Sequence, residues 1–146
     1  MKLSENANYL EYMRAFADEK YEAARLALGK CLNDSQEPAY NRAFLLQCLG
    51  NIYFLEQDEQ KSIEYFQLAE MTDPKSLLPR YMFAKFLAEK LGRCEDAIKK
   101  CDNILLNATA SPFNEAEEDF GSDYYITKTN ELKSFCEEKL KSRPVE

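Results

Sequence analysis

Two runs of apolar residues with helical period, separated by a polar turn, constrain this sequence more than any other feature. The apolar residues recur every three or four positions, which places each run on one face of a helix. They are Leu46, Leu49, Ile52 and Tyr53 in the first run and Ile63, Phe66 and Ala69 in the second. Between the runs, EQDEQK is polar and typical of a turn. Because Pro74 disfavours a helical backbone at Asp73, the second helix should end there. The stretch therefore predicts a hairpin of two helices.

The spacing within this stretch also resembles a known repeat. Its pattern is Leu46-x2-Leu49-Gly50-x2-Tyr53, followed by Ser62-x3-Phe66-x2-Ala69-x4-Pro74. It resembles the 34-residue tetratricopeptide repeat. The resemblance implies that the large residues fill the space between the two helices. It also implies that small residues at Gly50, Ser62 and Ala69 allow neighbouring helices to approach closely. Ser62 stands where alanine is usual, and it is small enough for the same role.

A single hairpin of this kind cannot bury its own apolar faces, so neighbouring repeats are expected. Downstream, Phe83, Ala84 and Leu87 follow Leu49, Gly50 and Tyr53 at a distance of 34 residues (49 to 83). Ala97, Cys101 and Ile104 follow Ser62, Phe66 and Ala69 at a distance of 35 (62 to 97), so one extra residue is expected in the turn that holds Gly92. Upstream, Tyr21, Ala24, Leu28 and Cys31 resemble the second helix of a degenerate repeat.

The predicted fold class is all-α: a right-handed α-solenoid of about three such helical hairpins plus a C-terminal capping helix. The repeats are expected within residues 1–106, at about 7–33, 39–74 and 77–106. Residues 107–122 are expected to form an acidic loop. Residues 123–142 are expected to form a capping helix that covers the open apolar end of the stack.

The residues that usually perform catalysis are scarce. The chain has no histidine, which removes the commonest general base and the commonest metal ligand. Its four glycines lie far apart and form no phosphate-binding loop. The five cysteines include no C-x-x-C pair and are expected to be buried thiols. We therefore expect no enzyme activity, no cofactor and no metal site.

Charge and hydropathy limit the classes of partner. The net charge of -7 disfavours binding to nucleic-acid phosphates and suits a basic partner. The chain has neither an apolar run of signal-peptide length at its start nor a segment of the length needed to span a bilayer. We therefore expect a cytoplasmic protein that binds neither nucleic acid nor membrane.

The tetratricopeptide resemblance implies a scaffold that binds a protein or peptide in a concave groove lined by the first helix of each repeat. By repeat position, the candidate groove residues are Leu10, Arg14, Gln47, Asn51, Tyr81, Met82 and Lys85. One branch of the family clamps an acidic C-terminal tail with lysine and asparagine on its first two groove helices. Asn51 matches one of those positions, but Leu10 and Arg14 replace the lysine and asparagine of the first repeat. That tail-binding role is therefore disfavoured.

A second candidate surface and a second candidate function stay open. The acidic run after the repeats could steer a basic partner by its field, or only keep a loop solvated. Its residues are Glu115, Glu117, Glu118, Asp119 and Asp123. The alternative to a general adaptor is a small bacterial chaperone or toxin-neutralising immunity-type protein that shields one cognate, basic partner. Either function is compatible with a homo-oligomer.

Overall fold

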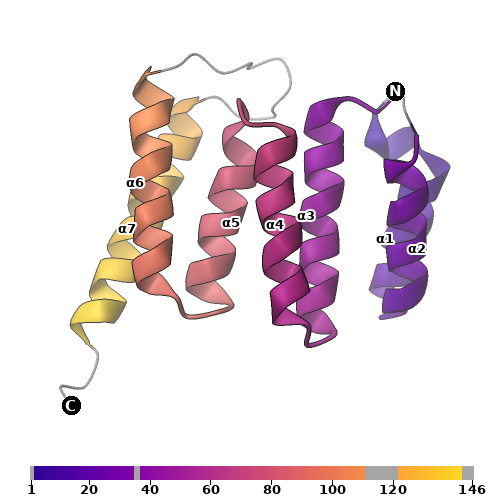
Figure 1. Ribbon diagram of the computed structural model, residues 1–146, viewed down its shortest axis with the longest axis horizontal. Coiled ribbons are helices and arrows are strands. Elements are labelled where there is room, and N and C mark those ends of the chain that lie inside the picture. The colour runs from indigo at the N-terminus through magenta and orange to yellow at the C-terminus, as the bar shows by residue number, and fades with distance from the viewer. Residues whose placement is uncertain (1, 35–36, 111–121, 143–146) are drawn as a thin grey trace. The chain divides into compact units, whose positions relative to one another are not determined.

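The computed structural model describes residues 2–34, 37–110 and 122–142 of the 146-residue chain, and all regular structure in them is helical. A 3-10 helix, η1 (Leu3–Glu5), comes first, and the remaining elements are α-helices without a strand among the described residues (Figure 1). They are α1 (Ala7–Ala17), α2 (Tyr21–Leu32), α3 (Ala39–Leu55), α4 (Glu59–Thr72), α5 (Leu77–Glu89), α6 (Cys94–Ala110) and α7 (Ser122–Lys141). The prediction of an all-α fold is confirmed.

The helices divide into two compact units, one ending at Asp73 and one beginning at Pro74. In the first unit α1 packs against α2, α3 packs against α4, and α2 also contacts α3. In the second unit α6 packs against both α5 and α7, and α5 contacts α7. No described helix combines the length and the apolar character that crossing a membrane requires.

Side-chain and backbone signals in the sequence explain where several helices begin and end. The Asn6 side chain accepts hydrogen bonds from the backbone N–H groups of Asn8 (2.9 Å) and Tyr9 (3.2 Å), which caps the start of α1. Asp58 caps α4 in the same way through the N–H of Lys61 at 3.1 Å. At its other end α4 stops at Thr72, directly before the Asp73–Pro74 pair.

Each of the three hairpin turns contains one residue with a left-handed backbone. These residues are Glu19 (φ 58°), Gln57 (φ 66°) and Gly92 (φ 65°). After Glu19 and Gln57, the next N–H donates to the carbonyl five residues earlier, from Lys20 to Ala15 at 2.9 Å and from Asp58 to Tyr53 at 2.8 Å. This is the geometry of a Schellman helix end, for which glycine is the usual left-handed residue. Only the third turn has the glycine.

Small residues bring α3 and α4 into close contact. A Cβ atom added to Gly50 would lie 2.8 Å from two carbons of the Phe66 ring. The buried Ser62 hydroxyl donates to the Gly50 carbonyl at 2.7 Å, so the serine occupies a small-residue position and also makes an interhelical hydrogen bond. Ala69 is fully buried on the same helix as Ser62. The close packing of α3 against α4 therefore requires small residues at these positions.

Polar contacts hold the helices of the first unit together at both ends. The Glu37 carboxylate is buried and accepts from the side-chain amides of Asn41 (2.8 Å) and Asn6 (3.3 Å), which joins the start of α1 to the start of α3. Arg25 on α2 makes a two-point ion pair with Glu56, with N–O distances of 2.7 and 3.1 Å. The Arg25 guanidinium also lies 5.4 Å from the centre of the Tyr53 ring.

Candidate functional site

The candidate groove residues of the first unit differ in exposure. Leu10 (47% exposed) and Arg14 are exposed on α1, and Asn51 is half-buried on α3. Gln47 is only 4% exposed, and its Oε1 atom accepts no hydrogen bond from the described residues. On this unit, therefore, α1 offers the more accessible candidate side chains, and the Gln47 amide is withdrawn from the surface.

The candidate residues of the second unit come together around a pocket between α5 and α7. The pocket has a volume of about 220 Å³, and we call it the tyrosine pocket. Its lining consists of Leu78, Tyr81, Met82, Lys85, Tyr124, Tyr125 and Lys128. The three candidates from α5 (Tyr81, Met82 and Lys85) all belong to this lining. The groove residues predicted from the sequence include none of the α7 side of the pocket.

Three tyrosine rings form the aromatic part of the tyrosine pocket. Tyr125 is 2% exposed and meets Tyr81 edge-on, with ring centres 6.2 Å apart. Tyr124 is 38% exposed and stands almost perpendicular to Tyr125, with ring centres 5.2 Å apart. The buried ring therefore fixes the positions of two more accessible rings. Preordered aromatic surface of this kind loses little conformational entropy when a ligand covers it.

The polar groups of the tyrosine pocket are phenols and ammonium groups. Burial raises the pKa of Tyr81, and the neighbouring Tyr124, Glu89 and Glu131 add to the shift, so its hydroxyl stays a neutral donor and acceptor at neutral pH. The Lys128 ammonium lies 5.9 Å from the centre of the Tyr124 ring and 3.5 Å from a Glu131 carboxylate oxygen. Lys85 is half-buried and forms no ion pair with any described residue.

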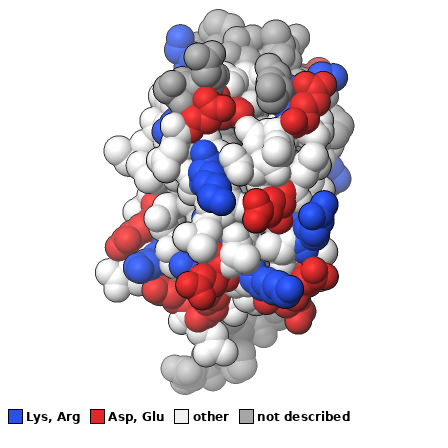
Figure 2. Space-filling model, turned by 90° about the vertical axis from the view of Figure 1, so that its right-hand side faces the viewer, with Lys and Arg blue, Asp and Glu red and all other residues white. Residues whose placement is uncertain are grey.

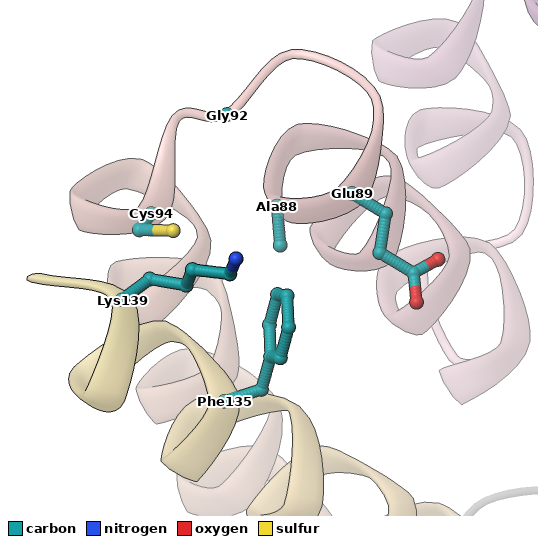
Figure 3. Close-up of a pocket in the computed structure, with 6 residues that line it drawn as sticks. All are labelled: Ala88, Glu89, Gly92, Cys94, Phe135 and Lys139. Atoms are coloured by element: carbon teal, nitrogen blue, oxygen red, sulfur yellow. The ribbon is translucent and has the colours of Figure 1, made fainter. Parts of the chain in front are cut away.

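A second pocket lies beside the other end of α5 and has a volume of about 440 Å³ (Figure 3). Ala88, Glu89, Gly92, Cys94, Phe135 and Lys139 line it. The Lys139 side chain extends across it above the Phe135 ring, with 5.5 Å between the nitrogen and the ring centre (Figure 3). Phe135 is 42% exposed, so a large apolar surface faces this pocket. Its charged groups, Glu89 and Lys139, are both exposed.

All five cysteines are buried free thiols. Burial raises the pKa of Cys48 and of Cys101 to about 11. Burial also raises the pKa of Cys136, and the adjacent Cys94 adds to the shift. Because the thiolate is the reactive form, these thiols are poor nucleophiles at neutral pH. Among the described residues, no group of three His, Cys, Asp or Glu side chains could hold a metal ion.

The acidic run lies mostly outside the described residues. Glu115, Glu117, Glu118 and Asp119 fall in the segment 111–121, and only Asp123 is described. Asp123 is exposed in the first turn of α7, where a carboxylate is favoured by the partial positive charge of the helix start. At the face of the molecule that Figure 2 shows, acidic and basic side chains are interspersed with uncharged ones, and neither sign forms a single field.

The tetratricopeptide resemblance rests on the residues of the α3–α4 hairpin. Neither protein-family models nor curated proteins match the chain. Within this hairpin, Gly50 lies against the Phe66 ring and the Ser62 hydroxyl donates a hydrogen bond to the Gly50 carbonyl.

Proposed function

We propose that this chain is a protein–protein interaction module without enzyme activity. In this proposal its hairpins stack as a right-handed solenoid, as the tetratricopeptide resemblance implies, and a protein or peptide partner binds along the first helix of each repeat. The partner contacts would then include the α5 residues Tyr81, Met82 and Lys85. A cytoplasmic location belongs to the same proposal.

The tyrosine pocket is the observation that carries this proposal. It combines half-buried aromatic and methionine surface with phenol and ammonium groups. Tyrosine is enriched at the energetic centres of protein interfaces because one side chain supplies both a large apolar area and a hydrogen-bonding group. Methionine adds apolar surface that adapts to the shape of a ligand. The pocket is smaller than the 300–1,000 Å³ typical of small-molecule sites, which favours a single anchoring side chain of a larger partner.

The residues around the tyrosine pocket would contribute to binding in two ways, through buried apolar area and through directional hydrogen bonds. A partner side chain that enters between Tyr81 and Tyr124 would remove their ring edges from water, which supplies most of the free energy of binding. The Tyr81 hydroxyl and the Lys85 ammonium then fix its orientation by hydrogen bonds. The dissociation rate should depend mainly on the apolar area that the partner buries against the rings.

The test is to isolate the stoichiometric partner from cells of the native host and to measure its binding to a Tyr81→Ala/Met82→Ala variant by surface plasmon resonance. We expect dissociation to be at least about tenfold faster than from the wild type. The matched control is Met71→Ala, which removes an exposed methionine of α4 in the first unit and should leave the kinetics unchanged. Melting temperatures of both variants show whether folding is affected. Wild-type kinetics for a folded double variant would exclude the tyrosine pocket as the contact surface.

A further inference from the structure

The charged residues in the described lining of the tyrosine pocket are basic, whereas the chain as a whole is acidic. The whole sequence has a net charge of -7, with 26 acidic and 19 basic residues. Of the described residues that line the pocket, two are lysines and none is a carboxylate. Ligand recognition depends on charges within a few ångströms, because solvent screens those farther away. The pocket therefore favours an acidic ligand, although the net charge favours a basic one.

The two lysines are not equivalent. Lys128 is paired with Glu131 one turn along α7, at 3.5 Å, so part of its charge is compensated. Glu131 and Glu89 also contribute to the raised pKa of Tyr81, so these two carboxylates lie close to the rim. Lys85 has no ion pair within the described part of the chain. Of the two lysines, Lys85 is therefore the one without an ion pair to a described residue, and it lies one helical turn from Tyr81 on α5.

The apolar part of the pocket limits the size and shape of the ligand. About 220 Å³ is enough for one large side chain, and the rings of Tyr81, Tyr124 and Tyr125 surround it with edges and faces. Aromatic rings prefer edge-to-face or offset contacts with other rings, at centre distances of about 4.5–7 Å. A phenylalanine or similar ring of the ligand can therefore join this cluster.

We propose that the pocket recognises a short acidic–aromatic peptide segment: a ring inserted among the tyrosines, and a neighbouring carboxylate bonded to the Lys85 ammonium. This inference rests on the proposed function and specifies the chemistry of the partner at that site. The Tyr81 hydroxyl is a second donor within the same lining. A basic segment would instead place its charge beside Lys85 and Lys128, with compensation only from the rim carboxylates.

The experiment uses the full chain labelled with ¹⁵N and three capped peptides that differ only in charge. The probes are acetyl-Gly-Glu-Phe-Glu-Gly-amide and the same peptide with glutamine or with lysine in place of glutamate. Both ends are blocked, so binding cannot depend on a free C-terminal carboxylate. Titration followed by NMR measures the affinity of each peptide and locates the binding site.

We expect the glutamate peptide to bind about tenfold more tightly than the glutamine peptide, and the lysine peptide to bind most weakly. The shifted amide signals should include those of Tyr81, Lys85 and Tyr124. In Lys85→Gln, the preference for glutamate over glutamine should fall to about twofold or less, while the affinity for the glutamine peptide stays the same. The control Lys75→Gln removes an exposed lysine outside the pocket and should keep the full preference.

Three results would overturn the inference. Equal affinity for the three peptides would show that the lysines do not select charge, and it would leave the proposed protein-binding function intact. A preference for the lysine peptide, or shifts confined to other surfaces, would show that the pocket does not recognise an acidic ligand. Absence of shifts with every peptide at millimolar concentration would remove the pocket as a peptide site. Failure of the partner to bind the chain at all is a separate result, which would overturn the proposed function.

Discussion

At the scale of single residues, Gly50 is the position where added volume matters most. An alanine there would bring its methyl group to 2.8 Å from the ring of Phe66, which is almost fully buried, and to 3.2 Å from the Ser62 carbonyl. Overpacking of this kind costs about 1–3 kcal/mol. It exceeds the usual gain of about 0.5–1 kcal/mol for replacing a helical glycine with alanine. We expect Gly50→Ala to lower the free energy of unfolding by about 1–2 kcal/mol in urea denaturation.

The matched control is Gly29 on α2, where an added Cβ would have no atom within 4 Å. Gly29→Ala should therefore show only the gain in helix propensity and raise the free energy of unfolding by about 0.5–1 kcal/mol. If both alanine variants change stability in the same direction, the close contact at Gly50 is wrong.

The buried thiols predict a loss of stability in alkaline solution. The pKa of Cys48 and that of Cys101 rise from 9.0 to about 11 on folding. Between these values the unfolded chain has lost thiol protons that the folded chain retains, so the free energy of unfolding falls as pH rises. The contribution is fully present below pH 9 and is lost as pH rises toward 11. Urea denaturation at pH 8, 9 and 10 measures the slope.

A Cys48→Ala variant removes one of these two thiols, whose pKa rises on folding. Its stability should start lower, because a buried group is lost, but should decline less steeply above pH 9 than that of the wild type. Parallel pH profiles for the two proteins would contradict a raised pKa for Cys48.

At the scale of elements, two hairpin turns place a residue with a side chain in the left-handed backbone conformation that glycine usually adopts. Gln57 has a left-handed backbone at the end of α3, a conformation that costs a side-chain-bearing residue about 1–2 kcal/mol. Gln57→Gly should relieve this strain and still lose some free energy to the greater entropy of the unfolded chain. We expect a net gain of about 0.5–1 kcal/mol in thermal or urea denaturation. The same change at Gln67, exposed within α4, should instead destabilise by a similar amount. Equal effects at the two positions would refute the strain at Gln57.

The sequence predicts the helices themselves because their signals are local. Apolar period places α3 and α4, and the Asp73–Pro74 pair explains why α4 ends at Thr72. The left-handed backbone at Gln57 could not be predicted from residue type, because glutamine carries no preference for it. There the hydrogen bonds of the helix end and the packing of the following helix decide the conformation.

The candidate site was less predictable, because its residues depend on contacts between helices. Repeat register selected Tyr81 and Lys85 on α5, and both line the tyrosine pocket. Tyr124 and Lys128 could not be selected in the same way, since the docking of α7 on α5 decides which of its side chains reach the pocket. Repeat register also selected Gln47 as a groove residue, but this side chain is almost completely buried, which register alone does not predict.

At the scale of the whole molecule, average charge and local charge point to different partners. A net charge of -7 would attract a basic protein from a distance, since such fields act on the association rate. The described lining of the tyrosine pocket instead contains two lysines, Lys85 and Lys128. Local contacts control dissociation and specificity, so the pocket rather than the net charge should decide which segment is retained.

Hydrogen–deuterium exchange of the full chain, with and without its isolated partner, measures directly whether the partner covers the tyrosine pocket. If the partner binds at the tyrosine pocket, backbone amides of α5 and of the first half of α7 should exchange more slowly in the complex. Helix α2 of the first unit, where Leu26 is exposed, is the internal control, and the exchange of its amides should be unchanged. Protection confined to α2 and α4, with α5 and α7 exchanging as in the free chain, would contradict the assignment of the partner to this pocket.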